Sequence, residues 1–196
     1  LVNAGNANAF TGKQGLIACE NKALALSNLF QCDIKNIFFS STGVIGVQLP
    51  HQDIIKHLDL LKNNLSESGL EAASKAILTT DLKSKIYTKK FKIDNKVFTI
   101  SAIAKGSGMI MPNMATMLAF IFTDYAIDKK TLSMMTKKGV QESFNRISVD
   151  GDTSTSDSVF VATTNKKCLE LTKDRKEKAL DYFYNELKGA MIDLSL

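Results

Sequence analysis

The sequence predicts an α/β (α+β) fold, a layered sandwich in which helices pack against a sheet. Three observations lead to this class. Stretches with helical and with strand periodicity alternate along the 196 residues, and only two prolines interrupt them. Residues 86–104 have the alternating pattern of a β-hairpin with a turn at residues 94–96. Residues 117–122 are continuously apolar, which is typical of a strand buried on both faces.

Five segments are predicted to be helical. Residues 14–30 carry apolar side chains at helical spacing, and a second helix begins at His51, directly after Pro50, and continues through Leu61. The other helices are expected at residues 72–76, 129–144 and 172–192. Strands are expected at residues 1–5, 37–39, 86–93, 97–104, 117–122 and 159–162, in an order that the pattern leaves open. We expect residues 1–196 to form a single domain with a core that needs no staples.

The charge and the cysteine content argue against several classes of function. The net charge is +5, but the densest lysine runs, at residues 83–92 and 166–178, are expected on solvated faces without a basic–aromatic platform. We therefore expect no nucleic-acid partner, and a small anionic substrate fits the charge equally well. The three cysteines are widely spaced, so neither a zinc site nor a disulfide framework is expected, and a reducing compartment fits.

The chain carries no targeting signal that the pattern reveals. No apolar run reaches about 18 residues, so no membrane span is expected. The N-terminus lacks the charged start and apolar core of a signal peptide. Because the first residue is not methionine, we expect a piece of a longer protein.

The most unusual stretch is residues 105–118. Lys105 and a Gly-Ser-Gly loop are followed by Pro112, and Thr116 then stands at the mouth of the predicted buried strand. A hydroxyl at this place can serve an active site. A surface loop with a strand-starting threonine explains the same residues, and the residues alone favour that interpretation.

Three further features have a functional and an ordinary interpretation. Thr42 and Gly43, expected just after a strand, can aim a hydroxyl and an N–H at one oxygen, as an oxyanion hole requires, or form a tight turn. Residues 150–157 are dense in side-chain oxygens, which suits calcium or, more simply, a self-bonded turn. His51 and His57 come with no triad pattern and are interpreted as surface or packing residues.

The motifs occur in an order that carries more information than each motif alone. They are residues 5–12, 41–46, 79–81, 105–118 and 150–155, and the string Pro-Asn-Met-Ala-Thr-Met-Leu at 112–118 is the most specific. This order closely resembles the ornithine acetyltransferase family, also called glutamate N-acetyltransferase. The resemblance covers essentially the whole chain.

The resemblance implies how the protein is made and folded. Family members are made as one precursor that cuts itself at the bond matching Ala115–Thr116. Residues 1–115 then match the C-terminal part of the family's alpha chain, and residues 116–196 match the N-terminal part of its beta chain. The two chains stay associated, which implies a heterotetramer of two alpha and two beta chains. The implied fold is the α/β sandwich shared with the DmpA aminopeptidases, related in logic to Ntn hydrolases.

The resemblance also implies a reaction and its residues. An acetyl group moves from N2-acetylornithine to glutamate in the cytoplasm, and some members use acetyl-CoA as donor. Thr116 matches the nucleophile, and Thr42 and Gly43 match the oxyanion hole. Thr79, Lys105 and Thr116 match substrate-binding positions. No metal and no cofactor are implied.

The chemistry is coherent with these residues. A threonine hydroxyl needs a base, and cleavage before Thr116 would free its own α-amine, whose reference pKa of about 7.7–8 leaves it partly neutral. Lys105 either lowers the pKa of that amine or holds a substrate carboxylate.

Two alternatives remain open. One is a DmpA-like aminopeptidase or amidohydrolase on a similar fold, although such enzymes use a serine nucleophile in a different context. The other is a catalytically incomplete fragment. The family has a long segment after the position of Leu196 that carries an acidic substrate-binding motif, so we expect an incomplete substrate pocket.

Overall fold

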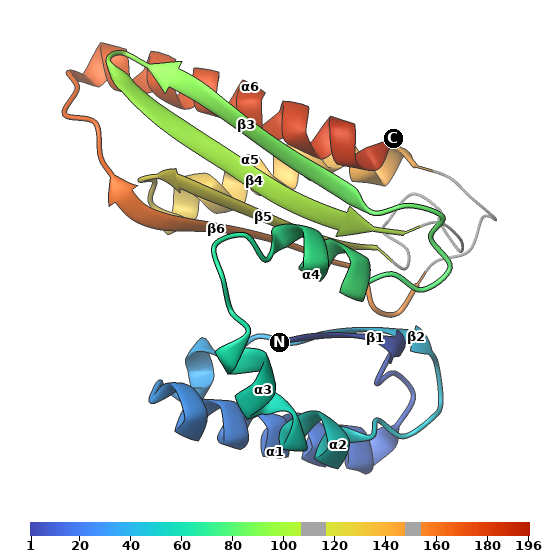
Figure 1. Cartoon of the computed structure of the whole chain (residues 1–196). Coiled ribbons are helices and arrows are strands. Elements are labelled where there is room, and N and C mark those ends of the chain that lie inside the picture. Colours follow the sequence, from blue (N-terminus) through green and yellow to red (C-terminus); the bar gives the residue numbers. More distant parts are fainter. Residues whose placement is uncertain (107–116, 148–153) are drawn as a thin grey trace. The chain divides into compact units, whose positions relative to one another are not determined.

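The computed structural model describes residues 1–106, 117–147 and 154–196. They form two compact units, Leu1–Thr79 and Thr80–Leu196 (Figure 1). The expected α/β class is confirmed, because both units combine helices with strands. The expectation of a single domain stays a prediction. None of the helices in the described part of the chain is long and apolar enough to span a bilayer.

The first unit has a two-stranded parallel sheet and helices that pack together. Its elements are β1 (Val2–Asn6), α1 (Gly12–Phe30), the 3-10 helix η1 (Ile34–Asn36), β2 (Ser40–Val44), α2 (His51–Lys56), α3 (Leu58–Asn63) and α4 (Leu70–Ala76). Helices α2 and α3 lie alongside α1 (Figure 1). Ala18 and Leu26 make up part of the buried face of α1, which ends where Gln31 adopts a left-handed conformation.

The second unit has a four-stranded sheet in the order β3-β4-β5-β6 with two long helices. Its elements are β3 (Lys85–Ile93), β4 (Lys96–Lys105), β5 (Leu118–Tyr125), α5 (Lys129–Glu142), the 3-10 helix η2 (Phe144–Arg146), β6 (Ser158–Lys167) and α6 (Lys173–Ser195). The first three strands run antiparallel, whereas β5 and β6 run parallel, as the crossover through α5 requires.

The core of the second unit lies between the sheet and its helices. Phe98 of β4, Ile121 of β5 and Phe183 of α6 are completely buried there. Aromatic rings make the central contacts: the Tyr125 ring centroid lies 4.7 Å from that of Phe183 and 5.0 Å from that of Phe98. Burial of such rings supplies a large share of the hydrophobic stabilisation of a small unit.

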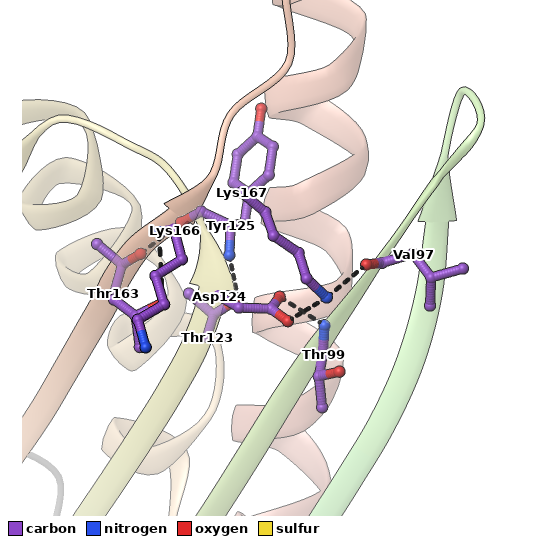
Figure 2. Close-up of polar contacts among 9 residues, drawn as sticks. Val97, Thr99, Thr123, Asp124, Tyr125, Thr163, Lys166 and Lys167 are labelled. Atoms are coloured by element: carbon purple, nitrogen blue, oxygen red, sulfur yellow. Dashed lines mark hydrogen bonds and ion pairs between the residues drawn. The ribbon is translucent and has the colours of Figure 1, made fainter.

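A polar network fixes the end of β5 that lies farthest from Leu118. Asp124 accepts the Thr99 N–H at 2.9 Å and pairs with the Lys167 ammonium at 2.7 Å. That ammonium also donates to the Val97 carbonyl at 2.9 Å, so β4, β5 and β6 are joined at one point (Figure 2).

Most expected elements are present, and two expectations were wrong. Residues 37–39 do not form a strand but precede one. The polar residues that follow them form β2, which pairs with β1. The second helix is not continuous: His57 has φ −98° and ψ 1° and separates α2 from α3. The apolar spacing continues across this break, which is why the sequence did not reveal it.

Candidate active site

Three charged side chains of the second unit gather at the end of the sheet where β4 stops and β5 and β6 begin. Lys105, the last residue of β4, pairs with Leu118 of β5, and Leu118 pairs with Ser158 of β6. The strand ends are therefore in line. Asp157 directly precedes Ser158, and the Asp81 carboxylate accepts the Gly106 N–H at 2.5 Å.

Asp157 holds the chain at the entry to β5. Its Oδ1 accepts the Met117 N–H at 2.6 Å, while the Met117 carbonyl accepts the Ser158 N–H at 2.9 Å. The Met117 peptide groups are thus fixed on both sides. The other carboxylate oxygen of Asp157, Oδ2, is buried and has no hydrogen-bond partner among the described residues.

Burial raises the pKa of the Asp157 carboxyl to about 6, and the Met117 N–H, the Ser154 hydroxyl and the Lys105 ammonium oppose this rise. A carboxyl with such a pKa changes its charge close to neutral pH. Perturbed carboxyl groups of this kind are more frequent at functional sites than elsewhere.

Lys105 is the second unusual group, because it is a lysine with only 1% of its surface exposed. Burial lowers the pKa of its ammonium, and the Asp81 and Asp157 carboxylates oppose that effect. A buried lysine between two carboxylates can hold a further carboxylate of a ligand or tune the charge of a neighbour. Gly106 follows with φ +150°, a conformation that favours glycine.

Thr42 and Gly43 lie inside β2 of the first unit and not in a turn after a strand, which corrects the expected local structure. Thr42 is completely buried, and its Oγ1 has no hydrogen-bond partner among the described residues. A buried hydroxyl without a partner is rare, so the Thr42 hydroxyl retains an unused donor.

A close approach of backbones explains the glycine at position 43. Gly43 pairs with Gly5 of β1, and it has φ +130°. A Cβ atom at position 43 would lie 2.2 Å from the Gly5 carbonyl carbon. Only glycine fits there without displacing β1.

The structure describes only some of the remaining expected site residues. Ala115 and Thr116 lie outside the described residues, and Met117 is the first described residue after them. Thr79 is an exposed residue at the end of the first unit. In the described ranges, no three acidic, cysteine or histidine side chains converge as a metal site would require.

Sequence reasoning assigned no role to Asp81 or Asp157. Asp81 lies in a motif that the resemblance uses, whereas Asp157 lies two residues after the last one. Their partners are distant: Gly106 is 25 residues from Asp81, and Met117 is 40 residues from Asp157. The one available signal was the position of Asp157 two residues before the strand expected at residues 159–162.

The whole chain matches one family. The model of the ArgJ family aligns with residues 1–196. The chain belongs to the ArgJ family. This membership confirms the resemblance that the motif order indicated.

Individual ArgJ proteins agree with this assignment. The chain is 42% identical to the arginine biosynthesis bifunctional protein ArgJ of Gluconobacter oxydans, over all of this chain and 46% of that protein. It is 44% identical to the ArgJ protein of Pseudomonas fluorescens, over all of this chain and 47% of that protein. The chain therefore spans about half the length of the curated relatives that it matches.

A solved structure supports the fold. The crystal structure of the ArgJ protein from Bacillus halodurans matches with a TM-score of 0.51 and 37% sequence identity, covering 58% of this chain and 60% of that one. The likeness confirms the layered α/β fold of the ArgJ family.

Proposed function

We propose that this chain carries the nucleophile of an acetyltransferase that moves an acetyl group from N2-acetylornithine to glutamate through an acetyl-Thr116 intermediate. The observation that carries the proposal is the fixed Met117 peptide, in a chain that belongs to the ArgJ family along its whole length. Met117 is bonded to Thr116, so the order at the entry to β5 supports a nucleophile at this position.

Maturation comes first in the proposed sequence of events. The Thr116 Oγ attacks the Ala115 carbonyl carbon, and the Ala115–Thr116 amide bond breaks as an ester forms. Water then hydrolyses the ester, which restores the hydroxyl and leaves a free α-amine on Thr116. Before this step the same nitrogen is an amide and cannot act as a base.

Acetyl transfer follows in two steps. The α-amine takes the hydroxyl proton while the Thr116 Oγ attacks the acetyl carbonyl of N2-acetylornithine, and ornithine leaves. The amine of glutamate then attacks the acetyl-threonine ester and restores the hydroxyl. Some members of the family take the acetyl group from acetyl-CoA, and we extend that possibility to this chain.

The other residues of the proposal stabilise charge. Thr42 and the Gly43 N–H bind the oxyanion, a role supported by the unpaired, completely buried hydroxyl of Thr42. Lys105 binds a substrate carboxylate, since its buried ammonium provides a strong electrostatic partner. We include Thr79 as a substrate contact by its place in the family motif.

The proposal extends to the assembly. The two chains made by cleavage stay together in a cytoplasmic heterotetramer of two alpha and two beta chains. The reaction requires no metal, no cofactor, no nucleic acid and no membrane.

An assay of acetyl transfer in the complete protein tests the proposal. With N2-acetylornithine and glutamate, the wild type forms N-acetylglutamate and little free acetate. Thr116→Ala abolishes both transfer and chain cleavage, whereas Thr164→Ala, at an exposed threonine of β6, leaves both unchanged.

Two kinds of result would contradict the proposed function. Release of acetate without transfer to glutamate would indicate a DmpA-like hydrolase. Transfer that survives in Thr116→Ala, or a wild type that neither cleaves nor transfers, would remove Thr116 from the chemistry.

A further inference from the structure

We propose that Asp157 is a positioning residue for self-cleavage, because its ionised carboxylate fixes the Met117 N–H, and Met117 is bonded to Thr116. This inference rests on the proposed role of Thr116. It adds a residue, and a pH dependence of maturation, that the oxyanion-hole and substrate positions do not include.

The geometry at Met117 gives the first step of the argument. The Met117 N–H donates to Asp157 Oδ1 at 2.6 Å, and the Met117 carbonyl accepts from Ser158 at 2.9 Å. The Met117 nitrogen is bonded to the Thr116 carbonyl carbon. Asp157 is therefore the side chain that holds the peptide on the C-terminal side of the nucleophile.

The effect on rate follows from orientation. Cleavage requires the Thr116 hydroxyl to stay within reach of the preceding carbonyl, and loss of orientation slows an intramolecular attack. A hydrogen bond to an ionised acceptor is about twice as strong as one between neutral groups. Protonation of Asp157 therefore loosens the Met117 peptide and slows cleavage.

The charges near Asp157 are consistent with this titration. Lys105 of β4 is the cation that acts on Asp157, and Asp81 acts on Lys105 from the segment before β3. Lys85 of β3 interacts in turn with Asp81. Burial places the pKa of the Asp157 carboxyl at about 6, so its charge changes in an accessible pH range.

Measuring self-cleavage separates the titration of Asp157 from that of the catalytic α-amine. In acetyl transfer, the free α-amine of Thr116 also titrates, with a reference pKa of about 7.7–8. In the uncut chain that nitrogen is an amide and does not titrate. The two histidines of the sequence, His51 and His57, belong to the first unit and can be replaced by glutamine as a control.

The test is the rate of self-cleavage of the freshly refolded complete protein between about pH 5 and pH 8. The wild-type rate is expected to fall as pH drops through about 6, the pKa of Asp157. Asp157→Asn keeps an acceptor oxygen without the charge, so cleavage becomes about tenfold slower at neutral pH and loses its acidic limb.

Asp124→Asn is the matched control. Asp124 also accepts a backbone N–H and lies beside a lysine, but at the opposite end of β5 (Figure 2). This variant and the two histidine variants are expected to cleave at the wild-type rate with the wild-type pH profile.

An Asp157→Asn variant with the wild-type rate and acidic limb would overturn the inference. If that variant does not fold, the wild-type profile decides, since a rate that stays constant down to about pH 5 would also overturn it. The proposed function fails separately, when the wild type is not cut before Thr116 or when Thr116→Ala still is.

Discussion

Replacing Gly43 with alanine tests the close approach of β1 and β2 in the first unit. The alanine Cβ would lie 2.2 Å from the Gly5 carbonyl carbon and 2.5 Å from its oxygen, and both are backbone atoms that cannot rotate away. At φ +130° the alanine backbone is also strained, at a cost of about 1–3 kcal/mol. Relief of the contact requires a shift of β1, for which overpacked sites suggest about 1–3 kcal/mol more.

Gly5→Ala is the control for this experiment. Gly5 has φ +102°, but a Cβ atom there meets nothing within 4 Å, so it carries the strain without the contact. We therefore expect Gly43→Ala to lower the free energy of unfolding by about 1–3 kcal/mol more than Gly5→Ala.

Urea unfolding followed by far-ultraviolet circular dichroism measures both values, because the sequence has no tryptophan to report by fluorescence. Equal losses in the two variants would refute the argument that the approach of the two backbones demands glycine at position 43.

Two other predictions concern stability. Phe183→Ala removes a completely buried ring that stacks on Tyr125, and it should lower the free energy of unfolding by about 3–5 kcal/mol in thermal or urea unfolding. Leu82→Ala, at a fully exposed side chain of the same unit, should lower it by less than about 0.5 kcal/mol. Burial raises the pKa of Asp157 from 3.8 to about 6, so its contribution to stability is fully present below pH 3.8 and is lost as pH rises through 6. Asp157→Asn lacks this loss, so its stability relative to the wild type should increase by at most about 3 kcal/mol between about pH 4 and pH 7, and a constant difference would contradict the cause given for the raised pKa.

The stability that the protein is predicted to lose when Asp157 ionises is consistent with a functional role for this residue. An ionised, partly buried carboxylate that weakens the folded state at neutral pH is retained more readily when activity requires it. Loss of stability with rising pH and gain of cleavage rate with rising pH are therefore two consequences of the same ionisation.

Local patterns were sufficient to predict much of the fold. The hairpin of β3 and β4 was visible because its strands alternate and a short turn connects them. The long helix α6 was visible from its periodic apolar positions. The parallel pairings of β1 with β2 and of β5 with β6 connect distant segments, so the strand order had to come from the structure.

The strand β2 shows how tertiary contacts override propensity. Residues 37–39 have the apolar side chains of a strand, but residues Ser40–Val44 pair with β1. Small residues at positions 5 and 43 permit the two backbones to come close, and this requirement is not visible in a propensity pattern.

The site was predictable to a similar degree. Lys105, Thr42 and Gly43 entered the proposed site because each belongs to a motif of the family, and their roles stay predictions. Asp157 acquires a role only through its hydrogen bond to Met117, which joins residues 40 positions apart. No spacing rule connects them, since the contact exists only once β5 and β6 lie side by side.

Intact-mass analysis of the complete protein, before and after incubation with N2-acetylornithine, tests the central claim most directly. The account predicts two chains, the second beginning at Thr116, and the mass of one acetyl group added to that second chain until glutamate removes it. An uncut chain, or a cut chain whose acetyl group is located on a residue other than Thr116, would contradict it.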